Sequence, residues 1–252
     1  LFLGDNVYPK GIPDSSHLEK RKLAEEKLYY QLEIAKNFKG QSIFMPGNHD
    51  WYSGIEGLEE QARLVTEYLD EKKSFLPRKN CGIERLKINE EIVLLVIDSQ
   101  WYLENWNHYP TMNDDCDIKT REDFFEEIKS ELNKYQNELI LLAIHHPLFS
   151  NSSHGGQHLS WRQQLFPFGN FPLPVLGTLF NFLRTTIGIP QDLHSAPYRE
   201  LANRIKTEIT DRENVIVVSG HEHNLQYVEH ENIKQIISGA ASKTDPARAV
   251  HP

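Results

Sequence analysis

Residues 139–147 read LILLAIHHP, an apolar run that ends in two histidines and a proline. An uninterrupted apolar run of this length is typical of a strand that is buried on both faces. Because the histidines follow the run directly, we expect their side chains at the carboxyl end of that strand. The same order, a buried strand and then polar side chains, recurs along the chain and decides the fold class.

Further apolar runs alternate with amphipathic helical patterns on either side of this stretch. We predict strands over residues 1–4, 42–45, 85–88, 91–98, 139–144, 215–218, 225–228 and 233–237. We predict helices over residues 16–38, 55–72, 120–136 and 198–209. Apolar strands separated by helices indicate an α/β layered sheet. We therefore expect a single domain over residues 1–252, with an irregular insertion at about residues 151–194.

Two of these helices carry a recognisable start signal. Residues 14–16 read DSS and offer N-caps for the helix over residues 16–38. Thr120, with Asp123 three residues later, has the spacing of a capping box for the helix over residues 120–136.

The composition excludes several classes of protein. With 27 basic and 36 acidic side chains the net charge is −9, which argues against a general nucleic-acid binder because the phosphate backbone attracts a basic face. The chain contains no apolar run of 18 residues, so a conventional transmembrane helix is excluded. Only Cys81 and Cys116 are present, which excludes a disulfide framework or a cysteine-rich zinc site and leaves one bridge open.

The chain opens on an apolar strand, without an initiating methionine or a signal-like segment. We expect it to be part of a longer polypeptide, in which a targeting segment or further site residues would precede residue 1.

Four segments carry side chains that can bind a metal, and each follows an apolar strand. They are GDNVYP at residues 4–9, PGNHD at 46–50, HHP at 145–147 and GHEH at 220–223. In an α/β protein, the carboxyl ends of the strands form the edge at which active sites assemble. Any one segment is equally typical of a turn, a helix cap or a buried histidine. Four of them in this order favour one shared site.

Together these ordered segments resemble the metallophosphoesterase (calcineurin-like) superfamily, from about residue 4 to about residue 239. The first segment, GDNVYPKG, is most similar to the purple, tartrate-resistant acid phosphatase-like branch, whose pattern is GDxxY. The resemblance implies a double β-sandwich flanked by helices, with a dinuclear metal site at one edge. It implies iron, zinc or manganese as the cofactor, and a phosphoester as the substrate.

The resemblance also implies six metal ligands. Asp5 would bridge the two ions, and Tyr8 and His223 would bind the first. The second ion would take the remaining three, which are Asn48, His145 and His221. A phenolate at Tyr8 would favour ferric iron, although a tyrosine here could also point into the core.

The superfamily's opening block, a strand that carries an aspartate upstream of GDxxY, has no counterpart in this sequence. The first metal is then left with Asp5, Tyr8 and His223 alone. We expect this span to bind the first metal more weakly than the second.

Three further residues receive catalytic roles from the resemblance. His49 would contact the phosphate and support the leaving group, and Asp50 would orient the His49 ring. His154, in a loop of small residues, would be a second phosphate contact or an acid. The chemistry is reasonable on physical grounds, because a carboxylate between two cations lowers the pKa of a shared water, and the resulting metal-bridging hydroxide can attack phosphorus in line.

We therefore expect a metal-dependent phosphoester hydrolase that prefers phosphomonoesters. A phosphodiesterase, a mononuclear zinc hydrolase, and a pseudoenzyme that binds a partner on the same scaffold are the alternatives. An aspartate-bearing strand upstream of residue 1 would complete the site and favour the enzyme. The branch of the superfamily favours an extracytoplasmic compartment, periplasmic or secreted.

The apolar stretch at residues 161–194 contains four prolines and does not have the pattern of a membrane-spanning helix. We expect it to form a lid or cap at the mouth of the substrate site. The alternative is an exposed patch that contacts another domain or a membrane surface.

Overall fold

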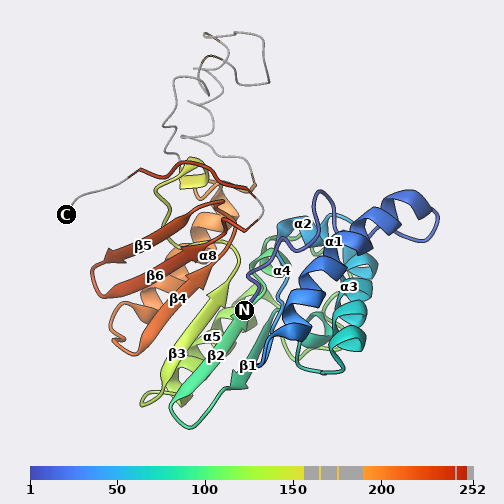
Figure 1. The fold of residues 1–252 in the computed structure, drawn as a ribbon. Coiled ribbons are helices and arrows are strands. Elements are labelled where there is room, and N and C mark those ends of the chain that lie inside the picture. The colour runs from blue at the N-terminus through green and yellow to red at the C-terminus, as the bar shows by residue number, and fades with distance from the viewer. Residues whose placement is uncertain (156–164, 166–174, 176–189, 242, 249–252) are drawn as a thin grey trace. The chain divides into compact units, whose positions relative to one another are not determined.

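The computed structural model of the protein describes residues 1–155, 165, 175, 190–241 and 243–248 (Figure 1). It divides into two compact units. The first unit comprises Leu1–His146 and Asn214–His221, and the second comprises Pro147–Glu213 and Glu222–Pro252. Among the described residues, no helix combines the length and the apolar composition needed to cross a membrane. Whether residues 1–252 act as a single domain stays a prediction.

The first unit contains four adjacent strands. They are β1 (Ile83–Lys87), β2 (Ile92–Ile97), β3 (Leu139–Ile144) and β4 (Val215–Ser219), in that order across the sheet (Figure 1). β1 runs antiparallel to β2, whereas β2, β3 and β4 are parallel to one another. Ile97 pairs with Ile144 at the ends of β2 and β3, so the residues that follow these strands emerge at the same edge.

Strands β2, β3 and β4 form because their side chains are apolar on both faces of the sheet, as the sequence predicts for a layered α/β protein, whereas β1, at the edge, also carries charged side chains. One core cluster joins β1, β2 and β3 to the segments before them, and its fully or nearly buried members are Ile43, Met45, Leu76, Leu86, Leu94, Val96 and Ala143. The α/β class is therefore confirmed, with a sheet of mixed strand direction. The double β-sandwich is not resolved and stays a proposal.

The predicted strands over residues 1–4 and 42–45 are reduced to isolated bridges. Phe2 pairs in parallel with Phe44, and Phe44 pairs in parallel with Phe75. The rings of Phe2 and Phe44 stack with their centroids 3.9 Å apart. The first pairing ends early because Gly4, with φ +89°, turns the chain out of the extended conformation.

The helices of the first unit are α1 (Leu18–Asn37), α2 (Asn48–Trp51), α3 (Gly54–Leu69), α4 (Ser99–Leu103) and α5 (Arg121–Lys134), with a short 3₁₀ turn at Arg78–Asn80. Helices α1 and α3 lie side by side, and α5 packs against β1 (Figure 1). The short helices α2 and α4 are not predicted by the periodicity, because neither is long enough to show it.

The two capping predictions have different outcomes. Thr120 and Asp123 form the expected capping box of α5, in which the Asp123 amide donates to Thr120 Oγ1 at 3.1 Å. Helix α1 begins two residues later than predicted, after His17, which makes no side-chain capping bond. Asp14 instead accepts from the Ser16 amide at 2.8 Å, which forms a local turn before the helix.

The second unit contains α8 (Ala196–Ile209), a 3₁₀ turn at Ser153–Gly155, and the antiparallel pair β5 (Leu225–His230) and β6 (Ile233–Ser238). Gln235 of β6 is fully buried, and its Oε1 accepts from the Leu148 amide at 2.7 Å. Most of the predicted insertion lies outside the described residues, so the lid and the contact surface expected at residues 161–194 stay predictions.

Cys81 and Cys116 form a disulfide across a sequence separation of 35 residues. The bridge left open by the sequence is therefore present.

Candidate metal centre

Three side chains of the first unit bring metal-ligating atoms together. Asp5, His145 and His221 each offer one such atom, and these atoms all lie within 4.8 Å of one another. Within the described parts of the chain, this is the one group of three or more His, Cys, Asp or Glu residues with that spacing. We call these three residues together with Asn48 the ligand cluster.

Sheet geometry places the histidines. His145 follows β3 directly, and His221 follows β4 after one glycine. Because β3 and β4 are parallel neighbours, both histidines emerge at the same sheet edge. Asp5 and His221 have left-handed backbones, with φ +55° and +61°, a conformation that non-glycine residues seldom adopt and that is often found at functional sites.

Two glycines let the backbone approach the ligand cluster closely. A Cβ on Gly4 would lie 2.5 Å from His145 Nδ1, and a Cβ on Gly47 would lie 2.4 Å from Asp5 Oδ1. Both distances are far below van der Waals contact, so any side chain at these positions would displace the ligands. The glycines of GDNVY and PGNHD are therefore required by packing.

Asn48 lies between the two histidines. Its Oδ1 is 3.1 Å from His145 Nε2 and 3.1 Å from His221 Nδ1. Its Nδ2 donates to the Tyr52 hydroxyl at 2.7 Å, which directs the amide oxygen toward the histidines. Tyr52 was missed by the sequence analysis, although its position four residues after Asn48 on a helical segment is the spacing of neighbours on one helix face.

The proton positions on His145 follow from its partners. His145 Nδ1 lies 2.6 Å from the Leu3 carbonyl oxygen, which can only accept, so Nδ1 carries a proton. The other ring nitrogen, Nε2, lies 3.3 Å from Asp5 Oδ1 and 3.1 Å from Asn48 Oδ1. Nε2 of the neutral ring therefore directs its lone pair at two oxygen acceptors, an arrangement that is stable only with a proton or a cation among them.

The pKa shifts of Asp5 and His145 also indicate a site for positive charge. Burial alone would raise the pKa of Asp5, but the charge and hydrogen bond of His145 lower it overall. Burial alone would lower the pKa of His145, but the Asp5 carboxylate raises it overall. Both directions show that the site favours positive charge next to Asp5. A carboxylate, an amide oxygen and imidazoles are also ligands that suit zinc, iron and manganese, so the ligand cluster fits a metal ion.

Tyr8 lies at this site and not in the core. Its hydroxyl donates to Asp5 Oδ2 at 2.8 Å, on the carboxylate oxygen that does not face His145. Burial, followed by the negative charge of Asp5, raises the pKa of the Tyr8 hydroxyl. In the metal-free protein Tyr8 is therefore a neutral donor to Asp5.

His49 has a different neighbour from the one predicted. Its backbone amide donates to Asp5 Oδ1 at 2.9 Å, and its ring Nδ1 donates to the Pro9 carbonyl at 2.7 Å. The ring lies near the rings of Tyr8 and Tyr52, at centroid distances of 4.2 and 4.9 Å. The bond to Pro9 leaves Nε2 of His49 as the nitrogen that can contact a ligand.

The expectation that Asp50 orients the His49 ring is wrong in this structure. Asp50 is fully buried and accepts instead from the amides of Gly47, Val7 and Asn6, at 2.8, 3.0 and 3.2 Å. Burial, followed by the charge of Asp5, raises the pKa of Asp50 to about 6. Asp50 thus fastens the loop after Asp5 to the loop before α2. Asp50 binds these amides and not the His49 ring, because the amides lie next to it in both loops and would otherwise be buried without hydrogen-bond partners.

The two remaining predicted site residues, His154 and His223, belong to the second unit. Each has a carboxylate at Nδ1: His154 lies 3.0 Å from Asp192, and His223 lies 2.8 Å from Asp245. A carboxylate at Nδ1 fixes the orientation of the imidazole ring. The roles of His154 as a phosphate contact and of His223 as a metal ligand stay predictions.

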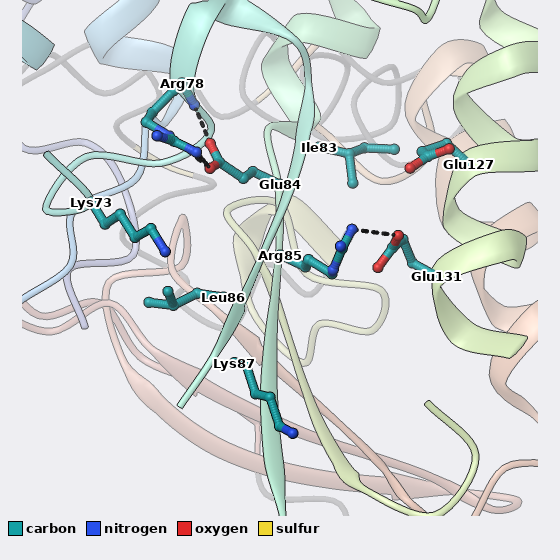
Figure 2. A pocket seen from close by; sticks show the side chains of 9 residues that line it. All are labelled: Lys73, Arg78, Ile83, Glu84, Arg85, Leu86, Lys87, Glu127 and Glu131. Carbon is teal, nitrogen blue, oxygen red and sulfur yellow. Dashed lines mark hydrogen bonds and ion pairs between the residues drawn. The ribbon is translucent and has the colours of Figure 1, made fainter. Parts of the chain in front are cut away.

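A hollow of about 410 Å³ lies elsewhere in the first unit, along β1. We call it the edge hollow; its lining includes Lys73, Arg78, Glu84, Arg85 and Glu131, and no member of the ligand cluster (Figure 2). Figure 2 shows Arg78 beside Glu84 and Arg85 beside Glu131, with nitrogen–oxygen distances of 2.7 and 2.9 Å. Both guanidinium groups are paired with carboxylates, so the positive charge of each is already balanced within the protein.

Comparisons with known proteins agree with the residue pattern. The family model for calcineurin-like phosphoesterases matches residues 1–225. Human tartrate-resistant acid phosphatase type 5 is 22% identical over 258 residues, which cover 98% of this chain and 62% of that protein. The chain thus spans about three fifths of the length of this relative.

Two solved structures are similar at low identity. GAP50, described as the anchor in the inner membrane complex of Plasmodium, gives a TM-score of 0.47 at 15% identity. The match covers 95% of this chain and 61% of the GAP50 chain. A Staphylococcus aureus protein described as a 5′-nucleotidase gives a TM-score of 0.41 at 11% identity. The match covers 85% of this chain and 34% of that protein. The family match extends over most of the residues, including all four motif segments, and on that basis the chain belongs to the calcineurin-like phosphoesterase family.

Proposed function

We propose that the protein hydrolyses phosphoesters, with phosphomonoesters preferred, at a metal site built on the ligand cluster. The observation that carries the proposal is the meeting of His145 Nε2 with Asp5 Oδ1 and Asn48 Oδ1, at 3.3 and 3.1 Å. The lone pairs of these three atoms repel one another in a buried site, and a cation between them would remove that repulsion. The family supplies the reaction class, because its members act on phosphoesters.

Asp5, Asn48, His145 and His221 would hold one metal ion, and Asp5, Tyr8 and His223 would hold a second, weaker one. Iron, zinc or manganese would suit these ligands. When bound, such ions supply positive charge for the phosphoryl oxygens and a water of lowered pKa. The carbonyl of Leu3 keeps His145 in the tautomer that presents Nε2, and Tyr52 keeps the amide oxygen of Asn48 facing inward.

His49 is our candidate for the phosphate contact and the group that protonates the leaving oxygen. Its Nδ1 is occupied by the Pro9 carbonyl, so Nε2 alone is available to a substrate. Two tyrosine rings, Tyr8 and Tyr52, restrict the orientation of the imidazole. A histidine held in this way can donate a proton from Nε2 to a leaving oxygen. We propose His154 as a second phosphate contact.

We also propose that the protein works in an oxidising, extracytoplasmic compartment. The disulfide between Cys81 and Cys116 supports this, because structural disulfides are rare where glutathione keeps thiols reduced. The similarity to an acid phosphatase points in the same direction.

The test compares p-nitrophenyl phosphate with bis-p-nitrophenyl phosphate, with and without a chelator, followed by addition of iron, zinc or manganese. We expect faster turnover of the monoester, loss of turnover with chelator, and recovery with metal. His221→Ala should abolish turnover, and His108→Ala, at an exposed histidine, should leave it unchanged. Turnover that survives the chelator would reject the metal mechanism. Absence of turnover with every metal would favour a pseudoenzyme, and a preference for the diester would favour a phosphodiesterase.

A further inference from the structure

Helix α1 has a second apolar face whose large side chains are mostly exposed. Its buried face, formed by Ala24, Leu28, Leu32 and Ala35, packs inward as an amphipathic helix should. Away from that face, Leu23, Tyr30, Ile34 and the C-cap residue Phe38 are 58%, 73%, 69% and 63% exposed. We call these four residues the α1 stripe. Four large apolar side chains in a line are not the scattered exposure that any protein surface shows.

The spacing of the α1 stripe follows the helix. Successive positions differ by seven, four and four residues, and each residue turns the helix by about 100°. Leu23, Tyr30 and Ile34 therefore lie within about 40° of one another around the axis. From residue 23 to residue 38 the stripe is about 22 Å long. That is long enough for a second helix to pack along it.

Opposite charges border the α1 stripe on its two sides. Glu19 and Glu26, seven residues apart, lie on one side, and Lys20 and Lys27, also seven apart, lie on the other. All four side chains are exposed. Lys27 Nζ also donates to the Tyr8 carbonyl at 2.9 Å, but an ammonium group has three protons to donate.

We infer that the α1 stripe is a dimerisation surface for a second copy of this chain, with the two α1 helices parallel. A two-fold axis along the helices places the acidic border of one stripe opposite the basic border of the other. A two-fold axis across the helices would make them antiparallel and would place residues 19–27 of each copy opposite the C-terminal half of the other stripe, so that the acidic and basic borders would not meet. Only the parallel arrangement brings the opposite charges together, so the charge pattern favours it.

The dimer should be weak. Stable dimers usually bury about 1,200–2,000 Å² in total, and a single pair of helices offers less. We therefore expect a monomer–dimer equilibrium with a dissociation constant in the micromolar range. The inference does not depend on the proposed phosphatase activity, because no member of the α1 stripe belongs to the ligand cluster.

Sedimentation equilibrium of the chain, from about 1 to about 200 µM, measures the dimer directly. Tyr30→Glu should raise the dissociation constant by at least about tenfold, because it places a charge in the contact. Tyr227→Glu is the matched control, since Tyr227 is 63% exposed on β5 of the second unit and should not affect association. Equal melting temperatures of the two variants would show that neither is misfolded. A monomer at all concentrations, or a dimer equally sensitive to both variants, would overturn the inference.

Cysteine cross-linking tests the orientation. The described residues contain no free cysteine, because Cys81 and Cys116 are joined, so Leu23→Cys and Phe38→Cys each add one reactive thiol. In a parallel dimer each new thiol faces its own copy, and both variants should form disulfide-linked dimers. In an antiparallel dimer only residues near the centre of the stripe meet their own copies, so neither variant would cross-link. Cross-linking of Tyr30→Cys alone would therefore contradict the parallel arrangement.

Discussion

The ligand cluster and the edge hollow are both polar, and the difference between them identifies the candidate site. In the edge hollow, each guanidinium group faces a carboxylate: Arg78 faces Glu84, and Arg85 faces Glu131. In the ligand cluster, His145 Nε2 faces two oxygen atoms that only accept. In the first arrangement each guanidinium charge is balanced by a carboxylate, whereas the second needs a positive charge from a proton or a metal.

This comparison shows that the size of a hollow and its charge are poor guides to function here. The edge hollow is lined by several basic groups, as a phosphate site would be, yet its two guanidinium groups, on Arg78 and Arg85, are paired with carboxylates. The ligand cluster is nearly closed to solvent, and in it the lone pair of His145 Nε2 faces the acceptor oxygens of Asp5 and Asn48. Hydrogen-bond accounting distinguishes the two, and variants at both places can test it.

The largest expected effect belongs to Asp5→Asn. It removes the one negative charge of the ligand cluster while preserving its shape, so zinc binding should fall and kcat/KM for p-nitrophenyl phosphate should drop by at least about a thousandfold. Glu84→Gln removes a carboxylate from the edge hollow and should change neither zinc binding nor kcat/KM. Equal losses in both variants would mean that removing either carboxylate has a general effect and that the ligand cluster is not distinguished from the edge hollow as a metal site.

His49→Ala should have the second largest effect. Its ring can reach a substrate only through Nε2, so we expect kcat to fall by about a hundredfold while the amount of bound metal stays the same. Steady-state kinetics together with metal analysis of the same preparation separate these two quantities. A rise in KM at unchanged kcat would show that His49 only binds the phosphate, and loss of metal would show that it supports the ligand cluster instead.

Asp98 offers a test of a third situation, a carboxylate with hydrogen-bond donors but no opposite charge. It follows β2, accepts from Trp51 Nε1 at 2.9 Å and from the Trp101 amide at 3.0 Å, and is almost fully buried. Burial raises the pKa of Asp98 from 3.8 to about 7. Between these values the unfolded chain releases the proton and the folded chain keeps it, so stability should fall as the pH rises through this range.

Urea unfolding of the metal-free protein at pH 4.5 and pH 7 measures this decline, of which Asp98 alone can account for about 3 kcal/mol. Asp98→Asn should reduce the difference between the two pH values, and Asp114→Asn, at an exposed aspartate, should not. If Asp98→Asn leaves the difference unchanged, Asp98 is ionised in the folded protein across this range.

The smallest effect is expected at the edge hollow. Arg85 is 45% exposed in its pair with Glu131, and partly exposed ion pairs contribute about 0–1 kcal/mol to folding. Because Glu131 is only 9% exposed, Arg85→Ala also leaves a nearly buried carboxylate without its partner, so it should lower the free energy of unfolding by about 1–3 kcal/mol and leave phosphatase activity intact. A clear loss of activity would mean that the edge hollow takes part in function.

Much of the fold could be predicted from sequence because its signals are local. The apolar runs at 139–144 and 215–218 are buried strands, and Thr120 with Asp123 begins α5 as the capping pattern indicates. Residues 1–4 and 42–45 could not be assigned correctly, because how far two segments pair depends on the turn at Gly4 and not on their own composition.

The site was predictable to a similar extent. The order of the motif segments led to Asp5, Asn48, His145 and His221, which lie together in the first unit. The partners that orient them were not predictable, because the Leu3 carbonyl carries no residue-specific signal. Asp50 illustrates the same limit, since its neighbour in sequence, His49, is not its partner in space.

Anomalous diffraction from crystals of the protein loaded with zinc tests the central claim most directly. We predict a zinc peak within about 2.0–2.2 Å of ligand atoms on Asp5, Asn48, His145 and His221. We predict no peak in the edge hollow, where the charges are paired. A zinc ion bound elsewhere, with His145 Nε2 still facing Asp5 and Asn48 without a metal between them, would contradict the account.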